Sequence, residues 1–497
     1  MAMQTVWVLG DQLNRRIASL DGATPADTRI LFVRSEAKVA SKRWHRQRLH
    51  LVLTGMRRFA AESRSEGFEV DERTAPSFAA GLADHVAEFG STGVRVMEPM
   101  SWDGDVLFRR LDVEVVPSNQ FLCDRRDFAT WAAPRRRLVM EDFYRAQRRR
   151  FGYLMDGDEP AGGRWNLDAE NRKPPPSDGR AWAEPPRHRL DAVDRSVLDS
   201  LPASAFGAEP DGTWATSRSQ ATARLRHFVD VVLPAFGPHE DAMLSDEWRL
   251  AHSTLSHALN VGLLLPDEVC DAAEDAYRSG RVELASAEGF IRQVIGWREY
   301  VWGVYWLWMP EYRDVNALDA HRPLPPVFTG DSGTRMRCVS TAVSGIETRA
   351  WVHHIQRLMV LGNLALLAGV SPSEMVDWMW RSFIDGAEWV MLPNLLGMSL
   401  HADGGRMATK PYAAGGAYIN RMSDYCRECD YNPKQRVGDD ACPFTTLYWD
   451  FLDRNRSRLS GNHRMTMPLR NLDRMSDLSA VRTRAARVLE QLDSGDL

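Results

Sequence analysis

Lysine is scarce in this sequence, and long apolar runs are absent from it. Only five of the 62 basic residues are lysine, so arginine carries nearly all the positive charge of a chain whose formal net charge is −5. Arginine binds phosphate groups well, although such a bias can equally reflect genomic base composition. No run reaches the length of about eighteen apolar residues that a membrane helix needs, and the N-terminus lacks a signal-peptide pattern. We therefore expect a cytoplasmic protein without membrane spans.

A glycine-rich dinucleotide fingerprint is also missing. The turn at residues 10–13 follows the first strand-like run but lacks the second and third glycines of that motif, which argues against a nicotinamide site. The chain has 497 residues, of which 44% are hydrophobic and 26% charged. This length suits two to four domains of about 100–200 residues each.

The first part of the chain alternates β-rich and helical patterns. We expect strands at 5–9, 29–33, 94–97 and 113–116, with helices around 44–62 and 77–89. This alternation predicts a doubly wound parallel sheet with right-handed crossovers. The sequence therefore predicts an α/β N-terminal domain at 1–134.

The rest of the chain is predicted to be helical after a long connector. A basic helix at 135–150 and stretches rich in glycine and proline make up a connector at 135–189. Segments 286–308, 349–368 and 371–384 carry apolar residues at helical spacing. These patterns predict a larger all-α C-terminal domain at 190–497.

Four of the six cysteines form a pattern typical of a metal site. Cys426, Cys429 and Cys442 are spaced C-x2-C-x12-C, and Cys338 lies 88 residues upstream of Cys426. Such spacing favours metal over disulfide in a cytoplasmic chain. We favour a [4Fe–4S] cluster, with structural zinc and reactive or unpaired thiols as alternatives.

The helical part also carries polar groups suited to cofactor binding. Ser253, Thr254 and Ser256 are predicted to open a helix, and free N–H groups at a helix start bind pyrophosphate well. Gln293 and Arg298 lie among aromatic residues of another helix. His353 and His354 are predicted to lie on a third helix, with Arg357 one turn after His353 on the same face.

These residues belong to a set of motifs that resembles the photolyase/cryptochrome superfamily. Over the whole chain, the sequence is similar to the prokaryotic iron–sulfur (6-4) photolyases. The resemblance is carried, in order, by GDQL, GGRWNLDAENR, FIRQVIGWREY, HHIQRLM, EWVMLPNLLGM, TKPY, YINRMSDYC, CPF and LYWDFL.

The resemblance implies that the helical domain binds FAD. It assigns to FAD binding the residues Ser253, Leu255, Ser256, Gln293, Arg298, Arg357, Asp385, Glu388 and Asn394. Arg357 and Glu388 match an arginine and an acid that pair beside the flavin, and Asn394 matches the residue that faces flavin N5. An amide suits a reduced flavin because its oxygen can accept from N5–H.

The activity implied is light-driven repair of (6-4) lesions in UV-damaged DNA. An electron from photoexcited reduced FAD would reach a lesion flipped out of the duplex. His353 matches the family's proton donor, with His354 beside it, and Tyr412 is a candidate lesion contact. Asp168 matches a position at which relatives recruit a divalent cation such as Mg²⁺.

Two other functions fit the same residues. A cryptochrome-like blue-light receptor would use the flavin for signalling without repair, and the flavin motifs do not separate the two. Retention of His353, His354 and Tyr412 favours repair. A nucleic-acid-binding cluster protein without photochemistry is a third interpretation, which flavin absorption would exclude.

The resemblance also implies an electron relay and an antenna. Trp378 and Tyr418 match positions of the relay that photoreduces the flavin. The antenna of this branch is usually 6,7-dimethyl-8-ribityllumazine, and the cleft of a doubly wound sheet lies at the carboxyl ends of its strands. Asp11, Gln12 and Glu36 are the predicted contacts there, although Asp11 and Glu36 could simply cap helices.

Overall fold

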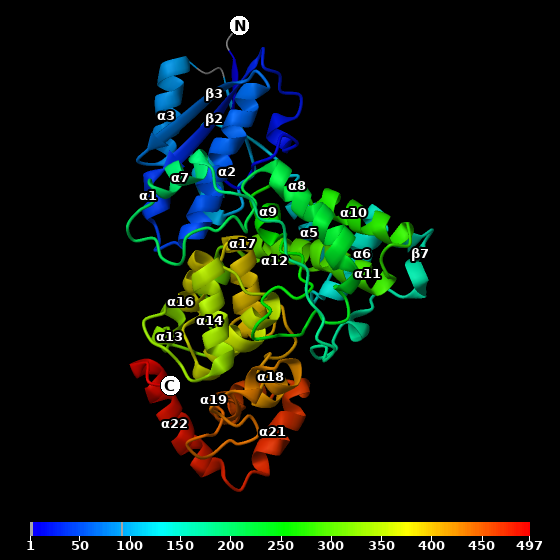
Figure 1. Ribbon diagram of the computed structural model, residues 1–497, viewed down its shortest axis with the longest axis vertical. Helices are drawn as coiled ribbons and strands as arrows, with labels where there is room; N and C mark the ends of the chain where they lie inside the picture. Colours follow the sequence, from blue (N-terminus) through cyan, green and yellow to red (C-terminus); the bar gives the residue numbers. More distant parts are fainter. Residues whose placement is uncertain (1–2, 91–92) are drawn as a thin grey trace.

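The computed structural model describes residues 3–90 and 93–497 as an α/β region joined to a larger helical region (Figure 1). The α/β region lies at one end of the long axis and the C-terminal helices lie at the other. None of the helices in these ranges combines the length and the apolar character that a membrane crossing requires.

A five-stranded parallel sheet forms the centre of the α/β region. Its strands are β1 (Gln4–Trp7), β2 (Thr28–Ser35), β3 (Glu69–Ala75), β4 (Val94–Met97) and β5 (Glu114–Val116), in the order β3-β2-β1-β4-β5. All the pairings are parallel, and Val6 lies opposite Ile30 in the register of β1 and β2. The doubly wound parallel sheet predicted from the sequence is confirmed.

One strand of this sheet was not predicted. β3 has the sequence EVDERTA, and its side chains are mostly exposed or half-buried. The strand pairs only with β2 at one edge of the described sheet. Charged side chains are common on edge strands because they discourage pairing with other chains, and they hide the apolar pattern by which strands are recognised.

Helices cover both faces of the sheet, with α2 (Arg46–Ser65) and α3 (Phe78–Phe89) as the longest of them. The shorter helices of this region are α1 (Glu36–Ala40), α4 (Trp102–Phe108) and α5 (Arg125–Ala132). Trp7 and Leu31 pack with α3 on one face, whereas Val6 and Ile30 belong to a core that continues into the helical region. Successive side chains of a strand point to opposite faces of the sheet, so alternate residues pack into two different cores.

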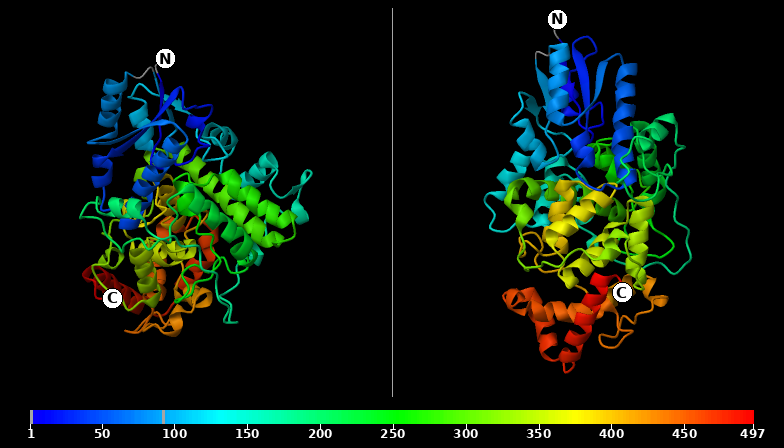
Figure 2. Two further views of the ribbon diagram at one scale, coloured as in Figure 1. Left: turned by 45° about the horizontal axis from the view of Figure 1, so that its top comes forward. Right: turned by 90° about the vertical axis from the view of Figure 1, so that its left-hand side faces the viewer.

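The helical region begins around α6 (Met140–Phe151) and a two-stranded hairpin, β6 (Met155–Asp156) and β7 (Glu159–Pro160). Its further α-helices are α7 (Ala192–Leu198), α8 (Arg218–His227), α9 (Ser256–Asn260), α10 (Pro266–Arg278), α11 (Leu284–Ile291), α12 (Glu299–Trp308), α13 (Pro326–Thr329), α14 (Arg337–Arg349), α15 (Asn363–Ala368), α16 (Pro372–Ser382), α17 (Glu388–Leu392), α18 (Gly416–Met422), α19 (Pro443–Arg454), α20 (Arg456–Leu459), α21 (Thr466–Asp473) and α22 (Leu478–Ser494). Figure 2 shows the C-terminal helices on the side of this region opposite the sheet. The predominance of helix after the connector is confirmed.

The predicted basic helix starts later than expected and turns part of its charge inward. Residues 135–137 precede α6, and Arg148 within it is fully buried, donating to the carbonyls of Tyr153 and Trp165. α6 packs against the helical region, and so does α5, which precedes it. The domain boundaries at 134 and 189 stay a prediction.

Candidate active site

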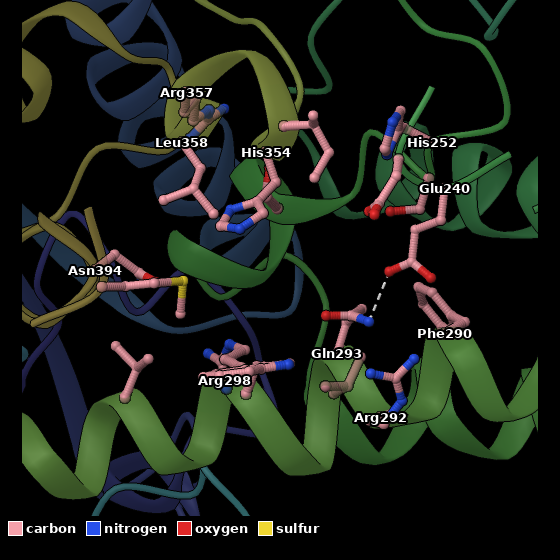
Figure 3. Close-up of a pocket in the computed structure, with 18 of the residues that line it drawn as sticks. Glu240, His252, Phe290, Arg292, Gln293, Arg298, His354, Arg357, Leu358 and Asn394 are labelled. Carbon is pink, nitrogen blue, oxygen red and sulfur yellow. Dashed lines mark hydrogen bonds between the residues drawn. The ribbon is translucent and has the colours of Figure 1, made fainter. Parts of the chain in front are cut away.

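A cavity of about 700 Å³ lies within the helical region, between segments that are far apart in the sequence (Figure 3). Three of its walls are π-helical segments: η6 (Arg292–Arg298) between α11 and α12, η8 (Gln356–Gly362) before α15, and η9 (Pro393–Ser399) after α17. Such widened turns occur frequently at functional sites. A volume of this size is typical of pockets for cofactors.

The cavity brings together most of the predicted site residues. It is lined by Asp168, Ser253, Ser256, Gln293, Arg298, His354, Arg357, Asp385, Asn394, Tyr412 and Tyr418. These residues come from the connector, the segment before α9, three π-helical segments, the loop before α17 and the C-terminal part. Their convergence depends on the tertiary fold, because they are spread over about half of the chain.

Arg357 and Asp385 form the central ion pair of this cavity. Arg357 Nη1 and Nη2 donate to the two oxygens of Asp385 at 2.9 and 3.0 Å, and the side chains are 17% and 6% exposed. Ser256 Oγ donates to Asp385 at 2.6 Å, and Asn260 Nδ2 donates to its carbonyl at 2.8 Å. A bidentate pair with further donors holds both side chains in fixed orientations.

The predicted pairing of Arg357 with Glu388 is therefore wrong. Glu388 is buried outside the cavity lining, where Arg313 Nε donates to it at 2.9 Å and the Tyr305 hydroxyl donates at 2.8 Å. The physical reason is local: Asp385 lies in the loop before α17 and faces the cavity, whereas Glu388 begins that helix and faces α12.

Arg298 presents unpartnered donors to the cavity. Its Nη1 donates to the Gln120 carbonyl at 2.9 Å, and its guanidinium lies 4.1 Å from the centroid of the Phe121 ring. Among the described residues, its buried Nε and Nη2 have no hydrogen-bond partner. Its Nη1 also lies 3.2 Å from the buried carboxylate of Glu299, so its charge is already paired, and its two unpartnered donors suit a hydrogen-bond acceptor in the cavity.

The predicted helix start at Ser253 is wrong as well. α9 begins at Ser256, and the preceding Thr254 has a positive φ of 51°. Leu255 is fully buried in the apolar core and does not line the cavity. Ser253 and Ser256 still reach the cavity wall, so the polar residues of this segment line the cavity although the helix starts later than predicted.

The two adjacent histidines occupy different environments. α14 ends at Arg349, Ala350 has a positive φ of 53°, and helix resumes at His354. His353 is 1% exposed and stacks on His252 with ring centroids 4.4 Å apart, whereas His354 opens onto the cavity. The expectation that both histidines lie on one helix is wrong, because the helix resumes only at His354 and His353 precedes it.

The surrounding protein lowers the pKa of both histidines, although only His353 is itself buried and the His354 side chain is exposed. Desolvation, followed by the nearby His252, His354 and Arg357, places the pKa of His353 well below its ordinary value. Desolvation and the charge of Arg357 lower the pKa of His354 to about 4. Both rings are therefore neutral near pH 7 unless an anionic ligand restores the charged form.

Acidic residues near Arg292 make up one side of the cavity. Glu240 accepts from Gln293 Nε2 at 2.7 Å, and burial raises its pKa to about 8. Asp168 pairs with Arg172 and with Arg292, whose Nη2 lies 3.2 Å away. Within residues 3–90 and 93–497, no three His, Cys, Asp or Glu side chains are close enough to share one metal ion. The residues around Asp168 do not fit the predicted divalent cation, because two arginines already neutralise this carboxylate.

Comparisons with known proteins agree on one family. The family model described as "Deoxyribodipyrimidine photo-lyase-related protein" matches residues 6–209. A protein of Agrobacterium fabrum named "(6-4) photolyase" is 42% identical, over 99% of this chain and 100% of its own length. The chain belongs to the photolyase family.

Two further comparisons concern the fold and a shorter relative. The crystal structure of a bacterial class III photolyase from Agrobacterium tumefaciens matches with a TM-score of 0.60 and 15% identity, over 99% of this chain and 98% of its own. At this identity the match shows the fold alone. An uncharacterized protein of Acanthamoeba polyphaga mimivirus is 25% identical over 134 residues, which is 27% of this chain.

This member of the photolyase family has a second cavity, lined by all four cysteines of the predicted metal site. Cys338 lies in the first turn of α14, Cys426 and Cys429 follow α18, and Cys442 directly precedes α19. The remaining wall is largely apolar and includes Tyr425, Tyr431 and Phe444. All four thiols line this one small space, although no three of them are close enough to share a single ion, so the arrangement suits a centre in which each thiolate binds a different metal atom. Cys123 and Cys270 are buried elsewhere, as predicted.

The predicted antenna contacts differ in whether their side chains are free to bind a chromophore. Gln12 is fully buried, and its Nε2 donates to the carbonyls of Met97 and Glu98 at 3.1 Å, so its side chain joins the ends of two strands. Asp11 is half-buried near Lys38 and Arg48, and Glu36 is exposed in the first turn of α1. Ser35, not Glu36, caps that helix. The expectation that Gln12 is free to bind a chromophore is wrong.

The predicted relay residues lie at different depths. Tyr418 lines the main cavity, with the Arg421 guanidinium 5.5 Å from its ring centroid. Trp378 is buried in the core, and the rings of Phe328 and Phe383 pack against it at 5.1 and 6.2 Å. Tyr412, 38% exposed, lines the open side of the main cavity.

Several cavity residues had no role predicted for them. Arg292 lies next to Gln293 in the motif FIRQVIGWREY, and Asn260 lies four residues after Ser256, so both could have been found by their neighbours. Glu240 and His252 reach the cavity from loops.

Proposed function

We propose that this protein repairs (6-4) pyrimidine–pyrimidone photoproducts in DNA by a light-driven reaction. The proposal is carried by one observation: the cavity gathers a buried bidentate pair, unpartnered arginine donors and an open histidine in a chain 42% identical over its length to a (6-4) photolyase. A redox cofactor and a flipped lesion need these groups in one pocket.

The residues of the main cavity fit FAD. Its volume is sufficient, and the unpartnered Nε and Nη2 of Arg298 suit hydrogen-bond acceptors of the cofactor. Arg357 and Asp385 would hold the polar edge of the ring system, and Ser253 would contact the phosphates. When bound and photoexcited in its reduced form, FAD supplies one electron to the lesion and takes it back after repair.

Asn394 would bind the flavin as an acceptor. Its Nδ2 donates to the carbonyl of Val390 at 2.8 Å, one turn earlier in the helix. This bond fixes the amide so that its oxygen can accept from a flavin N–H. The predicted role of Asn394 beside N5 stays part of the proposal.

His354, rather than His353, would supply the proton that repair needs. It is the member of the pair that opens onto the cavity. Its pKa of about 4 leaves it neutral at pH 7 in the protein alone, so a bound anion must raise that pKa before it can act as an acid. Reduced flavin and DNA phosphates both supply negative charge. Proton donation would therefore be coupled to substrate binding.

DNA would approach the open side of the cavity. Tyr412 lies there, partly exposed, and can stack on an extruded base. Residues 135–137 are three exposed arginines before α6 and can contact phosphates. A cytoplasmic location is part of the same proposal.

The cysteine cavity would hold a [4Fe–4S] cluster, and a lumazine antenna would bind at the sheet. Four thiols line the first site. Asp11 and Glu36, near the carboxyl ends of β1 and β2, remain the candidate antenna contacts. Release of iron and of a lumazine on denaturation would support both assignments; zinc, or FAD without lumazine after growth with lumazine supplied, would contradict them.

The deciding experiment is illumination of the purified, reduced protein with cyclobutane-dimer and (6-4) substrates in separate reactions. We expect restoration of the bases in the (6-4) substrate only. Repair of the cyclobutane dimer alone would identify that dimer, and not the (6-4) photoproduct, as the substrate. Flavin photoreduction with no repair of either substrate would identify a blue-light receptor instead.

A further inference from the structure

The start of α2, in the α/β region, is bonded to the ends of two helices of the helical region. The N–H of His45 donates to the Arg381 carbonyl at 2.9 Å, in the last turn of α16. Gln47 Nε2 donates to the Thr348 carbonyl at 2.8 Å, in the last turn of α14. The last carbonyls of a helix have no donor within that helix, so α2 completes the C-terminal ends of α14 and α16 from another region of the fold.

Both of these helices end directly before segments that reach the main cavity. Ala350 follows α14 with a positive φ of 53°, and His354 lies four residues later. α16 ends at Ser382, and Asp385 lies three residues later. The histidine and the carboxylate of the cavity thus both follow a helix end that α2 holds.

Ile384 joins these two segments to each other and to α2. Its N–H donates to the Ala350 carbonyl at 2.7 Å, and its own carbonyl accepts from Arg48 Nη1 at 3.1 Å. Arg357, which forms the ion pair of the cavity, also donates through Nε to the Val352 carbonyl at 2.7 Å. One network of hydrogen bonds therefore runs from Arg48 in the α/β region to both segments at the cavity.

Arg48 also contributes a positive charge near the cavity. Within residues 3–90 and 93–497 it forms no ion pair, and its guanidinium lies 5.4 Å from the centroid of the Trp44 ring. Burial lowers the pKa of Arg48 to about 10, and the charges of Asp385 and Asp11 offset part of this effect. Arg48 is therefore cationic at pH 7, and its charge acts on Asp385 in addition to the charge of Arg357.

We infer that Arg48 is a positioning residue for the main cavity, because it fixes the loop before α17 and with it the ion pair of Arg357 and Asp385. The inference rests on the proposed function in taking FAD as the ligand of this cavity. Ser256 and Asn260 hold Asp385 from within the helical region, so loss of Arg48 would free one end of the loop and leave the other contacts in place. A ligand that needs the pair in one orientation binds more weakly when that orientation is no longer fixed in advance.

Arg48 thereby gives the α/β region a part in the chemistry of the helical region. The bond between Ile384 and Ala350 links the same loop to the segment that leads to His354. A misplacement of about 1 Å can lower the rate of a reaction by about 100-fold. We therefore expect loss of Arg48 to weaken FAD binding, to change the setting of the bound flavin and to lower repair per bound flavin.

The test compares Arg48→Met, Arg48→Lys and a matched control, Arg34→Met. Arg34 also joins the two regions through a carbonyl, since its Nη2 donates to the Ser200 carbonyl at 2.9 Å, but neither residue lines the main cavity. Release of FAD on dilution of the purified holoprotein measures affinity. Visible circular dichroism reports the setting of the bound flavin, and light-driven repair by chemically reduced protein saturated with FAD measures the reaction.

Arg48→Met should raise the dissociation constant of FAD by about tenfold, which is equivalent to about 1.4 kcal/mol. It should also change the visible circular dichroism and lower repair by about tenfold. Arg48→Lys keeps a cationic donor and should recover most of the affinity, and it guards against misfolding of the methionine variant. Arg34→Met should match wild type in all three measurements.

Two results would overturn the inference. The first is wild-type affinity, circular dichroism and repair in Arg48→Met. The second is an equal loss in Arg48→Met and Arg34→Met, which would show that any weakening of the contact between the two regions has the same effect. A wild-type protein that binds FAD and repairs neither lesion, with an FAD affinity that depends on Arg48, would overturn the proposed function alone.

Discussion

Two cavities of the helical region, the main cavity and the cysteine cavity, are assembled in different ways. The cysteine cavity takes three of its four thiols from one short stretch, Cys426 to Cys442, and its wall is largely apolar. The main cavity takes its polar groups from the connector, several loops and three π-helical segments, and some of them, such as Ser256, Arg357 and Asp385, already bond to one another. A local motif thus predicts the thiols well, whereas the main cavity depends on tertiary packing. The two sites should therefore respond differently to the loss of one side chain.

The largest effect is expected from Cys442→Ala. Removal of a thiolate ligand should abolish nearly all bound iron, because the other three cannot complete the cluster. α19 begins directly after Cys442 and packs on α22, so we also expect a lower melting temperature. Iron analysis, visible absorption and thermal unfolding measure both effects.

Cys270→Ala is the matched control, since Cys270 is fully buried outside both cavities. It should lose stability through packing but keep its iron. Full iron content in Cys442→Ala would refute the cluster assignment and remove the contrast between the cavities.

Arg357→Ala should affect the main cavity next most strongly. It leaves Asp385 buried without its bidentate partner, a change that typically costs about 3–5 kcal/mol. We expect loss of FAD during purification with iron retained, measured by flavin and iron content.

Arg313→Ala provides the control for that variant. Arg313 pairs with the buried Glu388, outside the cavity lining, so this change should also lower stability but leave FAD bound. Equal loss of FAD from the two variants would show that general destabilisation, not the Arg357–Asp385 pair, controls binding.

The same contrast explains which parts of the structure were predictable. Alternating apolar patterns identified four strands, but the charged edge strand β3 carries no such pattern. The four cysteines came together as their spacing predicts, whereas the partner of Arg357 and the placement of His353 on a helix were predicted wrongly. Both errors arise beside breaks in helix, at Ala350 before His353 and in the loop that holds Asp385 before α17. Periodicity does not detect such breaks.

His354→Ala should lower the yield of repair by about 100-fold or more, the usual contribution of a positioned general acid. His353→Ala is the paired variant, because His353 lies behind the cavity and stacks on His252. It should keep most of the activity. Repair of a (6-4) substrate by chemically reduced protein under light measures both. A larger loss of repair in His353→Ala than in His354→Ala would identify His353 as the proton donor.

The smallest effect concerns a histidine outside both cavities. His45 is fully buried at the start of α2, where its Nδ1 accepts from the Gln47 N–H at 3.1 Å and its Nε2 lies 3.1 Å from the Glu347 carbonyl. Burial lowers the pKa of His45 to about 4. The unfolded chain takes up this proton near pH 6.5, so the folded state loses stability as the pH falls from about 6.5 toward 4. Between pH 7 and pH 5 this histidine should cost about 2 kcal/mol of unfolding free energy.

His45→Asn should remove that pH dependence, because asparagine can still cap α2 but does not titrate. The difference in unfolding free energy between wild type and variant should therefore shrink by about 2 kcal/mol between pH 7 and pH 5. Ser77→Ala is the control: it removes the cap of α3, which carries no titrating group, and should cost about 1 kcal/mol at either pH. Urea unfolding at the two pH values measures both variants. A constant gap between wild type and His45→Asn would show that the folded and unfolded states bind protons equally at His45, and would contradict its lowered pKa.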